Sequence, residues 1–130
     1  QFILDHGSIK ASDHFHALDA FTQAYIEAMF WTSTGALEDG DLQHMTLANL
    51  ADETWRQIEA DCRRFQEQNP CVLTDLEQAG HDFWLTHNGH GAGFWDGDWP
   101  EPHATRFDEA AKMFGMSDLY LGDDGRLYLT

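Results

Sequence analysis

The sequence predicts an α+β domain in which two long amphipathic helices and short helices pack on a small antiparallel sheet made of two β-hairpins. In the first half of the chain, apolar residues recur at steps of three and four, the period of a helix buried on one side. After Gly80 the period changes to two, and Asn88-Gly89 and Asp123-Asp124-Gly125 have the composition of tight hairpin turns. Helices that precede strands in this way are typical of the α+β class.

The first half is expected to contain two long helices and a short one. The first long helix spans about 13–31, and the second runs from Thr46 to Asn69, because Pro70 disfavours further helix. A short helix is expected at 74–80, where Thr74-Asp75-Leu76-Glu77 is a capping box and Gly80 is the residue expected beyond a helix end.

The second half is expected to contain two hairpins that flank a helix. Their predicted bounds are 81–87 and 90–95 for the first hairpin, Thr105–Phe114 for the helix, and 119–121 and 126–129 for the second hairpin.

Length and composition indicate one folded domain. The chain has 130 residues, of which 42% are hydrophobic and 13% aromatic, more apolar mass than a disordered acidic chain carries. We expect a single domain over 1–130, with a helical part at about 12–80 and a hairpin-helix-hairpin part at about 81–130. Because the sequence begins at Gln1 and not at Met, we expect a trimmed form or one domain of a longer product.

The strongest candidate site is the stretch 79–96, which concentrates His, Trp, Phe and Gly residues. In the predicted hairpin, Gly91 and Gly93 have no side chain and contribute to packing only if another group lies close to their backbone. Either Trp84 lies over these glycines, or they form the floor of a groove between Trp84 and Trp95 that binds a peptide, a planar ring or a partner's side chain. The candidate binding residues are His81, Asp82, Trp84, His87, Asn88, His90, Gly91, Gly93, Trp95 and Asp96.

The same stretch gives weaker support to metal binding or catalysis. His87 and His90 face each other in the predicted hairpin, but no spacing fixes a third metal ligand. Neighbouring strand residues point to opposite faces, which weakens an acid–base pair of His81 and Asp82. The sequence contains no nucleophile elbow and no Gly-rich phosphate loop. We therefore predict no catalytic residue and no cofactor, and an enzyme is less expected than a binding protein.

The charge restricts the class of partner. Seven Lys and Arg residues oppose 23 Asp and Glu residues, and the formal net charge is -16. This charge repels nucleic-acid phosphates and anionic membranes, so the expected partner is a protein with a basic surface. The chain starts without the basic region of a signal peptide, and no apolar run is long enough to span a membrane. Cys62 and Cys71 have no metal-ligand spacing and are expected to be buried thiols in a cytosolic protein.

Three segments follow one another in the chain: the stretch GHDFWLTHNGHGAGFWD, a predicted helix that begins at Thr and ends in Phe-Gly, and the stretch LYLGDDGRLYL. This pattern resembles an uncharacterised family of small proteins encoded by tailed bacteriophages and prophages. The resemblance is strong over 79–129 and looser over the helical half, where it includes Asp61-Cys62 followed by Phe65. The family pattern has Arg at the positions of His87 and Gly97, which argues against a metal role for His87. The resemblance implies a phage protein in the cytoplasm of the bacterial host, and no chemistry.

Three functions of different classes follow from these observations. The first is a phage accessory protein that binds a host or phage protein and inhibits a nucleic-acid-handling or defence system by presenting carboxylates in place of phosphates. Acids of the second helix, Asp52, Glu53, Glu59 and Glu67, form a partial row of this kind, although solubility or adaptation to high salt also explains them. The second is a small-molecule or metal-binding protein or enzyme that uses the hairpin, and the third is a structural or assembly protein of the phage.

Overall fold

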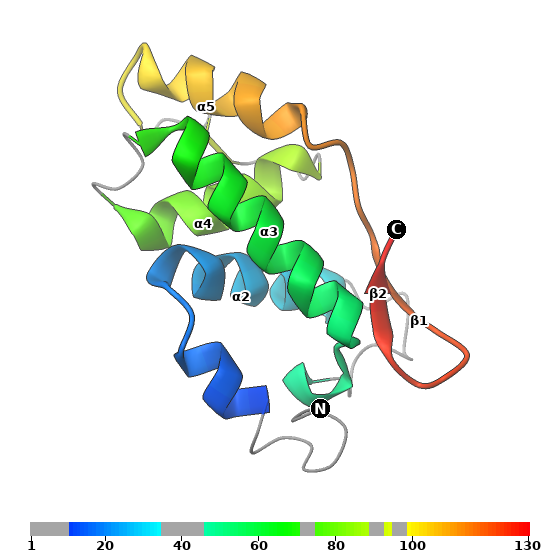
Figure 1. Cartoon of the computed structure of the whole chain (residues 1–130). Helices are drawn as coiled ribbons and strands as arrows, with labels where there is room; N and C mark the ends of the chain where they lie inside the picture. Colours follow the sequence, from blue (N-terminus) through cyan, green and yellow to red (C-terminus); the bar gives the residue numbers. More distant parts are fainter. Residues whose placement is uncertain (1–10, 35–45, 71–74, 89–92, 95–98) are drawn as a thin grey trace.

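The computed structural model describes residues 11–34, 46–70, 75–88, 93–94 and 99–130. These residues are mostly helical and include one small two-stranded antiparallel sheet (Figure 1). A helical segment at 11–16 precedes the main elements. Those elements are α2 (Ala20–Thr34), η1 (Leu47–Asn49), α3 (Asp52–Gln68), α4 (Leu76–His87), α5 (His103–Lys112), β1 (Leu119–Leu121) and β2 (Leu127–Leu129). The prediction of two hairpins is therefore wrong, whereas helices with a small antiparallel sheet are confirmed.

The first predicted helix is interrupted before α2. Residues 17–19 are not helical, and the Asp19 side chain accepts a hydrogen bond from the backbone N–H of Thr22 at 2.8 Å. This is an N-cap, so a new helix begins after Asp19. The side chain of Gln23 donates to the carbonyl oxygen of Leu18 at 2.9 Å and stabilises the break. The apolar spacing continues across the break, which is why the sequence indicated one helix.

The second predicted helix is interrupted by the sheet. The backbone N–H of Ala51 donates to the carbonyl oxygen of Leu127 in β2 at 3.1 Å, and Leu50 forms a parallel bridge with Leu127. The hydroxyl of Thr54 donates to the same carbonyl oxygen at 2.8 Å. These bonds hold residues 50–51 in an extended conformation between η1 and α3.

The first predicted hairpin is wrong because residues 81–87 form the C-terminal part of α4. The Asp75 side chain caps the start of this helix by accepting the N–H of Gln78 at 3.2 Å. At its end, the Asn88 side chain donates to the carbonyl oxygen of Trp84 at 3.0 Å. Asn88 is thus a helix C-cap rather than part of a turn between two strands. Gly89 and most of the second predicted strand lie outside the described residues.

Helix α4 has little exposed surface, and for this reason its sequence does not show the period of a helix. It lies between α2 and α5, and α3 crosses it, with Phe65 of α3 stacked on Phe83 of α4 (Figure 1). A helix that is covered on most sides has no polar stripe, so its sequence lacks the 3.6-residue pattern. Its buried residues are Ala79, Gly80, Asp82, Phe83, Trp84, Thr86 and His87.

Aromatic rings from four helices meet in the core around Phe65 of α3. The Phe65 ring stacks on Phe83 of α4, with centroids 4.4 Å apart, and lies 5.9 Å from Phe21 of α2. The Phe65 ring also stacks on Phe94 at 5.6 Å, and Phe107 of α5 is 5.2 Å from Phe94. The same core includes Leu119 of β1 and Leu127 of β2.

The second predicted hairpin is confirmed. Its strands pair in the register Leu119 with Leu129, Tyr120 with Tyr128, and Leu121 with Leu127. In the turn, the Asp124 side chain accepts the N–H of Arg126 at 3.0 Å, and Gly125 has a φ of 79°, which favours glycine.

Gly80 allows α4 to approach α2 closely. A Cβ atom at this position would lie 2.0 Å from the carbonyl oxygen of Phe21 and 3.1 Å from the Cβ of Ala24. The obstacle is the backbone of α2, so any larger residue requires the two helices to separate.

We expect Gly80→Ala to destabilise the protein by about 1–3 kcal/mol, the usual cost of overpacking. Helix propensity alone predicts the opposite sign, because Ala is favoured over Gly by about 1 kcal/mol in a helix interior. Urea unfolding measures the change in free energy. As a control, Gln57→Gly at an exposed site of α3 reports the propensity effect without a packing effect. A Gly80→Ala protein more stable than the parent would contradict the close-packing argument.

Candidate functional site

The structure places the described candidate residues on α4 and on the segment that follows it. His81, Asp82, Trp84 and His87 lie on α4, Asn88 caps it, and Gly93 precedes the buried Phe94. The other candidates, His90, Gly91, Trp95 and Asp96, lie outside the described residues.

His87 is the centre of a buried polar cluster and is only 3% exposed. Its Nδ1 lies 2.8 Å from the carbonyl oxygen of Gly115, which can only accept, so Nδ1 carries a proton. Its Nε2 lies 2.9 Å from the hydroxyl oxygen of Tyr25 and accepts from that hydroxyl. The Asn88 side-chain amide approaches the same Nε2 at 3.3 Å. Both ring nitrogens are therefore engaged, which leaves neither available to a metal ion.

Tyr25 is suited to the donor role in this cluster. Its side chain is fully buried in α2, and burial raises its pKa well above the usual value of 10.0. The hydroxyl consequently stays protonated and connects α2 to α4. The Asn88 Oδ1 accepts the backbone N–H of Ser117 at 2.5 Å, which connects α4 to the residues after α5.

Asp82 forms a second buried polar group on α4. Its carboxylate accepts from the Gln78 amide at 3.1 and 3.0 Å, and from the indole N–H of Trp99 at 2.7 Å. The Trp99 ring packs edge-on against Phe107 of α5, with centroids 5.3 Å apart. Asp82 therefore fixes the segment that leads into α5.

Trp84 does not form the wall of a groove. Its ring is buried in the core, and its indole N–H donates to the Thr32 hydroxyl of α2 at 2.8 Å. Trp95, the other predicted wall, lies outside the described residues. Trp84 therefore does not line the groove that was predicted between Trp84 and Trp95.

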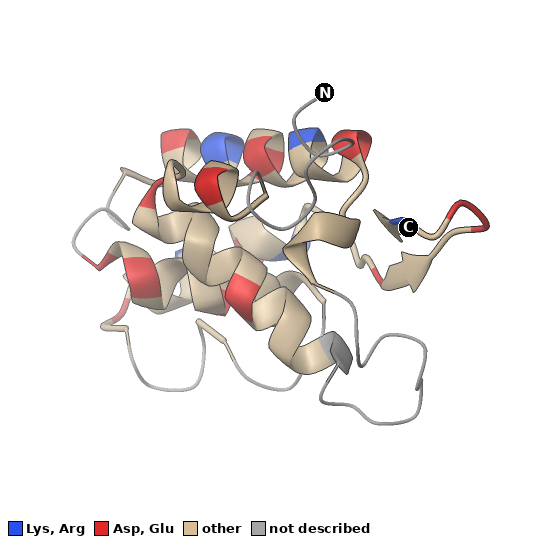
Figure 2. Cartoon of the chain, turned by 90° about the horizontal axis from the view of Figure 1, so that it is seen from below, with Lys and Arg blue, Asp and Glu red and all other residues tan. Residues whose placement is uncertain are grey.

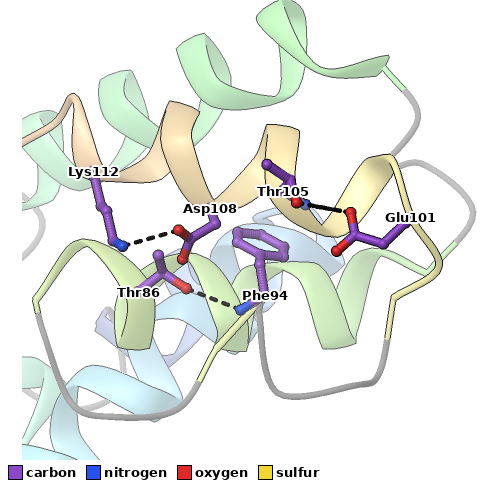
Figure 3. A network of polar contacts seen from close by, with 6 residues as sticks. All are labelled: Thr86, Phe94, Glu101, Thr105, Asp108 and Lys112. Atoms are coloured by element: carbon purple, nitrogen blue, oxygen red, sulfur yellow. Dashed lines mark hydrogen bonds and ion pairs between the residues drawn. The ribbon is translucent and has the colours of Figure 1, made fainter.

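The close approach predicted at Gly93 is present, but the approaching residue is Thr86 rather than Trp84. A Cβ on Gly93, whose φ is 136°, would lie 2.1 Å from the Thr86 Oγ1. That oxygen accepts the backbone N–H of Phe94 at 3.0 Å (Figure 3). Thr86 thereby holds the ring of Phe94 against the aromatic core.

Polar contacts also lie along α5. The Glu101 side chain accepts the N–H of Thr105 at 3.2 Å and its hydroxyl at 2.8 Å, and this caps the start of the helix (Figure 3). Nearer the end of α5, Lys112 forms an ion pair with Asp108 at 2.9 Å.

Residues outside the distinctive stretch are essential to these clusters. Tyr25 donates to His87, Trp99 donates to Asp82, and Ser117 donates to Asn88. Thr32 accepts from Trp84. Nothing in the sequence identified these residues, because each partner is separated from the stretch in the chain or belongs to a different predicted element.

Three hollows on the described surface lie away from the candidate residues. A cavity of about 340 Å³ separates residues 17–22 from α3, a groove of about 440 Å³ lies between α3 and α5, and one of about 450 Å³ lies on the β1–β2 hairpin. None of these three is lined by a candidate residue. Within the described ranges, no three His, Cys, Asp or Glu side chains are placed to hold a metal ion.

Cys62 of α3 is buried, as the sequence predicted, and burial raises the pKa of its thiol. A protonated, buried thiol is a poor nucleophile, so Cys62 is a packing residue. Cys71 lies outside the described residues.

Comparison of the chain with protein-family models, with curated proteins and with solved structures finds no match in any of the three. Among the described helices, none combines the length and the apolar character needed to cross a bilayer. Asp82, Trp84 and His87 of the candidate stretch are buried and make internal hydrogen bonds.

We expect Tyr25→Phe to destabilise the protein by about 1–2 kcal/mol, because it removes the buried hydroxyl that donates to Nε2 of His87. Urea unfolding at neutral pH measures the loss. Tyr120→Phe, at a position 44% exposed, is the matched control and should change stability little. Equal effects of the two substitutions would refute a specific Tyr25–His87 bond.

The hairpin turn contains an exposed tyrosine with a displaced pKa. The Tyr128 hydroxyl donates to the Asp124 carboxylate at 2.5 Å, and this bond raises the pKa of Tyr128 from 10.0 to about 12 and lowers that of Asp124. A raised pKa in the folded state stabilises the hairpin fully below pH 10. That contribution disappears as the pH rises through 12.

Absorbance titration at 295 nm tests this assignment when the curve of Tyr128→Phe is subtracted from that of the parent. The difference should show an ionisation near 12. In the Asp124→Asn protein, the pKa of Tyr128 should return toward 10.0, the ordinary value for tyrosine. A parent transition already at the ordinary value would disprove the hydrogen bond.

Proposed function

We propose that this protein is a small acidic accessory protein of a phage that acts by binding a protein partner with a basic surface. The first support is the accessibility of its acids. Among the described residues, Asp82 is the only acid in the buried interior. Two described acids contact a basic side chain: Glu59 forms a hydrogen bond with the ring of His14 at 2.8 Å, and Asp108 forms an ion pair with Lys112 at 2.9 Å. Most of the other acids in the described ranges lie at exposed positions.

The acids do not form an uninterrupted row along α3. Exposed Arg56, Arg63 and Arg64 lie on the same helix as the acids Glu53 and Glu67, so red and blue segments alternate along it (Figure 2). This alternation gives little support to a phosphate-like row on α3. A basic partner, such as a nucleic-acid-handling or defence protein of the host, still fits the overall charge of -16.

Exposed apolar side chains are the observation that carries the proposal. Met113 is 85% exposed and Met116 is 74% exposed near the end of α5, and Trp31 of α2 is 69% exposed. Solubility or salt adaptation explains surface acids, but it does not explain large apolar side chains in solvent. Methionine adapts to varied partner surfaces, and tryptophan is enriched in protein interfaces. Among the described residues, no observation of comparable weight favours a small-molecule or metal site.

Affinity capture from a bacterial lysate tests the proposal. The immobilised protein should retain a basic protein at low salt and release it near 0.5 M salt, since ion pairs at a surface are screened there. A double variant, Met113→Gln with Met116→Gln, keeps the charge and should lose most of the retained protein. Gln57→Asn, at an exposed polar site of α3, is the matched control and should retain it. Recovery of no basic protein, or equal retention by the methionine variant, would contradict the proposal.

A further inference from the structure

The outer edge of β1 carries backbone groups that β2 does not use. The N–H of Gly122 donates to the carbonyl oxygen of Arg126 at 2.7 Å, and the N–H of Thr130 donates to that of Asp118 at 3.1 Å. With the observed register, these bonds make Tyr120 and Tyr128 the hydrogen-bonded pair between them. The N–H and C=O groups of Leu119 and Leu121 therefore point away from β2.

In the described sheet, β1 has no second neighbour. The sheet contains β1 and β2 alone, and the other side of β2 pairs with residue 50. Figure 1 shows β2 between β1 and the start of α3, so β1 is the outer strand. The strand sequence Leu119-Tyr120-Leu121 has no Lys or Pro, the residues that commonly protect an edge from pairing with another chain.

The side chains around this edge favour a cationic occupant. Exposed carboxylates lie at both ends of β1, Asp118 before it and Asp123 and Asp124 after it. Tyr120 stacks on Tyr128 with ring centroids 5.8 Å apart, and 44% of Tyr120 remains exposed on the solvent face of the strand. A Lys or Arg side chain beside Tyr120 would gain both carboxylate contacts and a cation–π contact.

We propose that the outer edge of β1 is the docking site for an extended basic segment of the partner, which adds to the hairpin as a third strand. This inference rests on the proposed function and specifies the surface and the chemistry of the partner. Backbone hydrogen bonds from Leu119 and Leu121 would hold the segment, and Asp118 and Asp123 would select its charge.

A second copy of this chain fits the same edge less well. Antiparallel pairing of two β1 edges would bring Asp118 of one copy toward Asp123 of the other. Like charges across neighbouring strands are destabilising, whereas a basic strand turns both contacts into attraction. Charge complementarity therefore favours a basic partner over self-association.

The test uses the full chain labelled with ¹⁵N and a synthetic heptapeptide of alternating Lys and Val, with the Glu–Val peptide as the charge control. Two-dimensional NMR locates the bound peptide, and amide hydrogen exchange reads the edge directly. Exchange at Leu119 and Leu121 should slow about tenfold when roughly nine-tenths of the protein is bound. Exchange at Tyr120 should change less, because its N–H already bonds to β2. The Glu–Val peptide should not bind.

Two substitutions test the roles of charge and backbone. Asp123→Asn should weaken Lys–Val binding several-fold at low salt, whereas Glu109→Gln, an exposed acid of α5, is the matched control and should not. Leu121→Pro removes an outward N–H at an edge position that tolerates proline, and should abolish binding. If this variant does not fold, two results still decide whether the peptide docks at β1. These are the difference in exchange between Leu119 and Leu121 on one side and Tyr120 on the other, and the comparison of Asp123→Asn with Glu109→Gln.

The remaining outcomes overturn the inference in distinguishable ways. Peptide signals confined to α3 or α5, or equal effects of Asp123→Asn and Glu109→Gln, would remove docking at β1 and leave the proposed function standing. Failure of the peptide to bind, while lysate capture still yields a basic protein, has the same meaning. Failure of both experiments rejects both proposals. A dimer in sedimentation velocity that Leu121→Pro dissociates would assign the edge to a second copy.

Discussion

Helix α4 is covered by other elements on most of its surface, and this burial imposes a demand on every polar group that it carries. A buried polar group without a partner costs about 1–3 kcal/mol, a large share of the stability of a small domain. Asp82, Thr86 and His87 all face this cost, and each has an internal partner. The polar composition of this segment is thus explained by the packing of the helix, without recourse to an active site.

The partners of these polar groups come from other parts of the fold, and so the bonds also position those parts. Tyr25 ties α2 to His87, Trp99 ties the segment before α5 to Asp82, and Gly115 ties the segment after α5 to His87. Hydrophobic contact among aromatic rings is tolerant of sliding, whereas hydrogen bonds of fixed geometry are not. The aromatic core around Phe65 provides most of the burial, and the polar bonds of α4 select one arrangement of it.

Elements with one buried face could be predicted from the sequence, and elements with another pattern of burial could not. Helices α3 and α5 and the β1–β2 hairpin show a clean alternation between core and solvent, and the sequence predicts α5, the hairpin and the end of α3 to within a few residues. The start of α3 was predicted at Thr46 and lies at Asp52, because residues 50–51 bond to β2. Helix α4 lacks such an alternation, so its end was read as a strand. The stretch was correctly identified as unusual, but His87 finds its partner 62 residues away in Tyr25, and no local pattern encodes a contact of that kind.

Because α4 lies in the interior, the proposed recognition of a partner is assigned to surfaces that packing does not determine. The net charge of -16 acts at a distance and can speed the approach of a basic partner about 10- to 1,000-fold at low salt. Charge of this kind discriminates poorly between one basic protein and another. Exposed methionines and the backbone edge of β1 act only on contact, and they depend on shape and strand geometry. Under the proposed function, the acids would set the rate of encounter with a basic partner, and the short-range surfaces would set which encounters last.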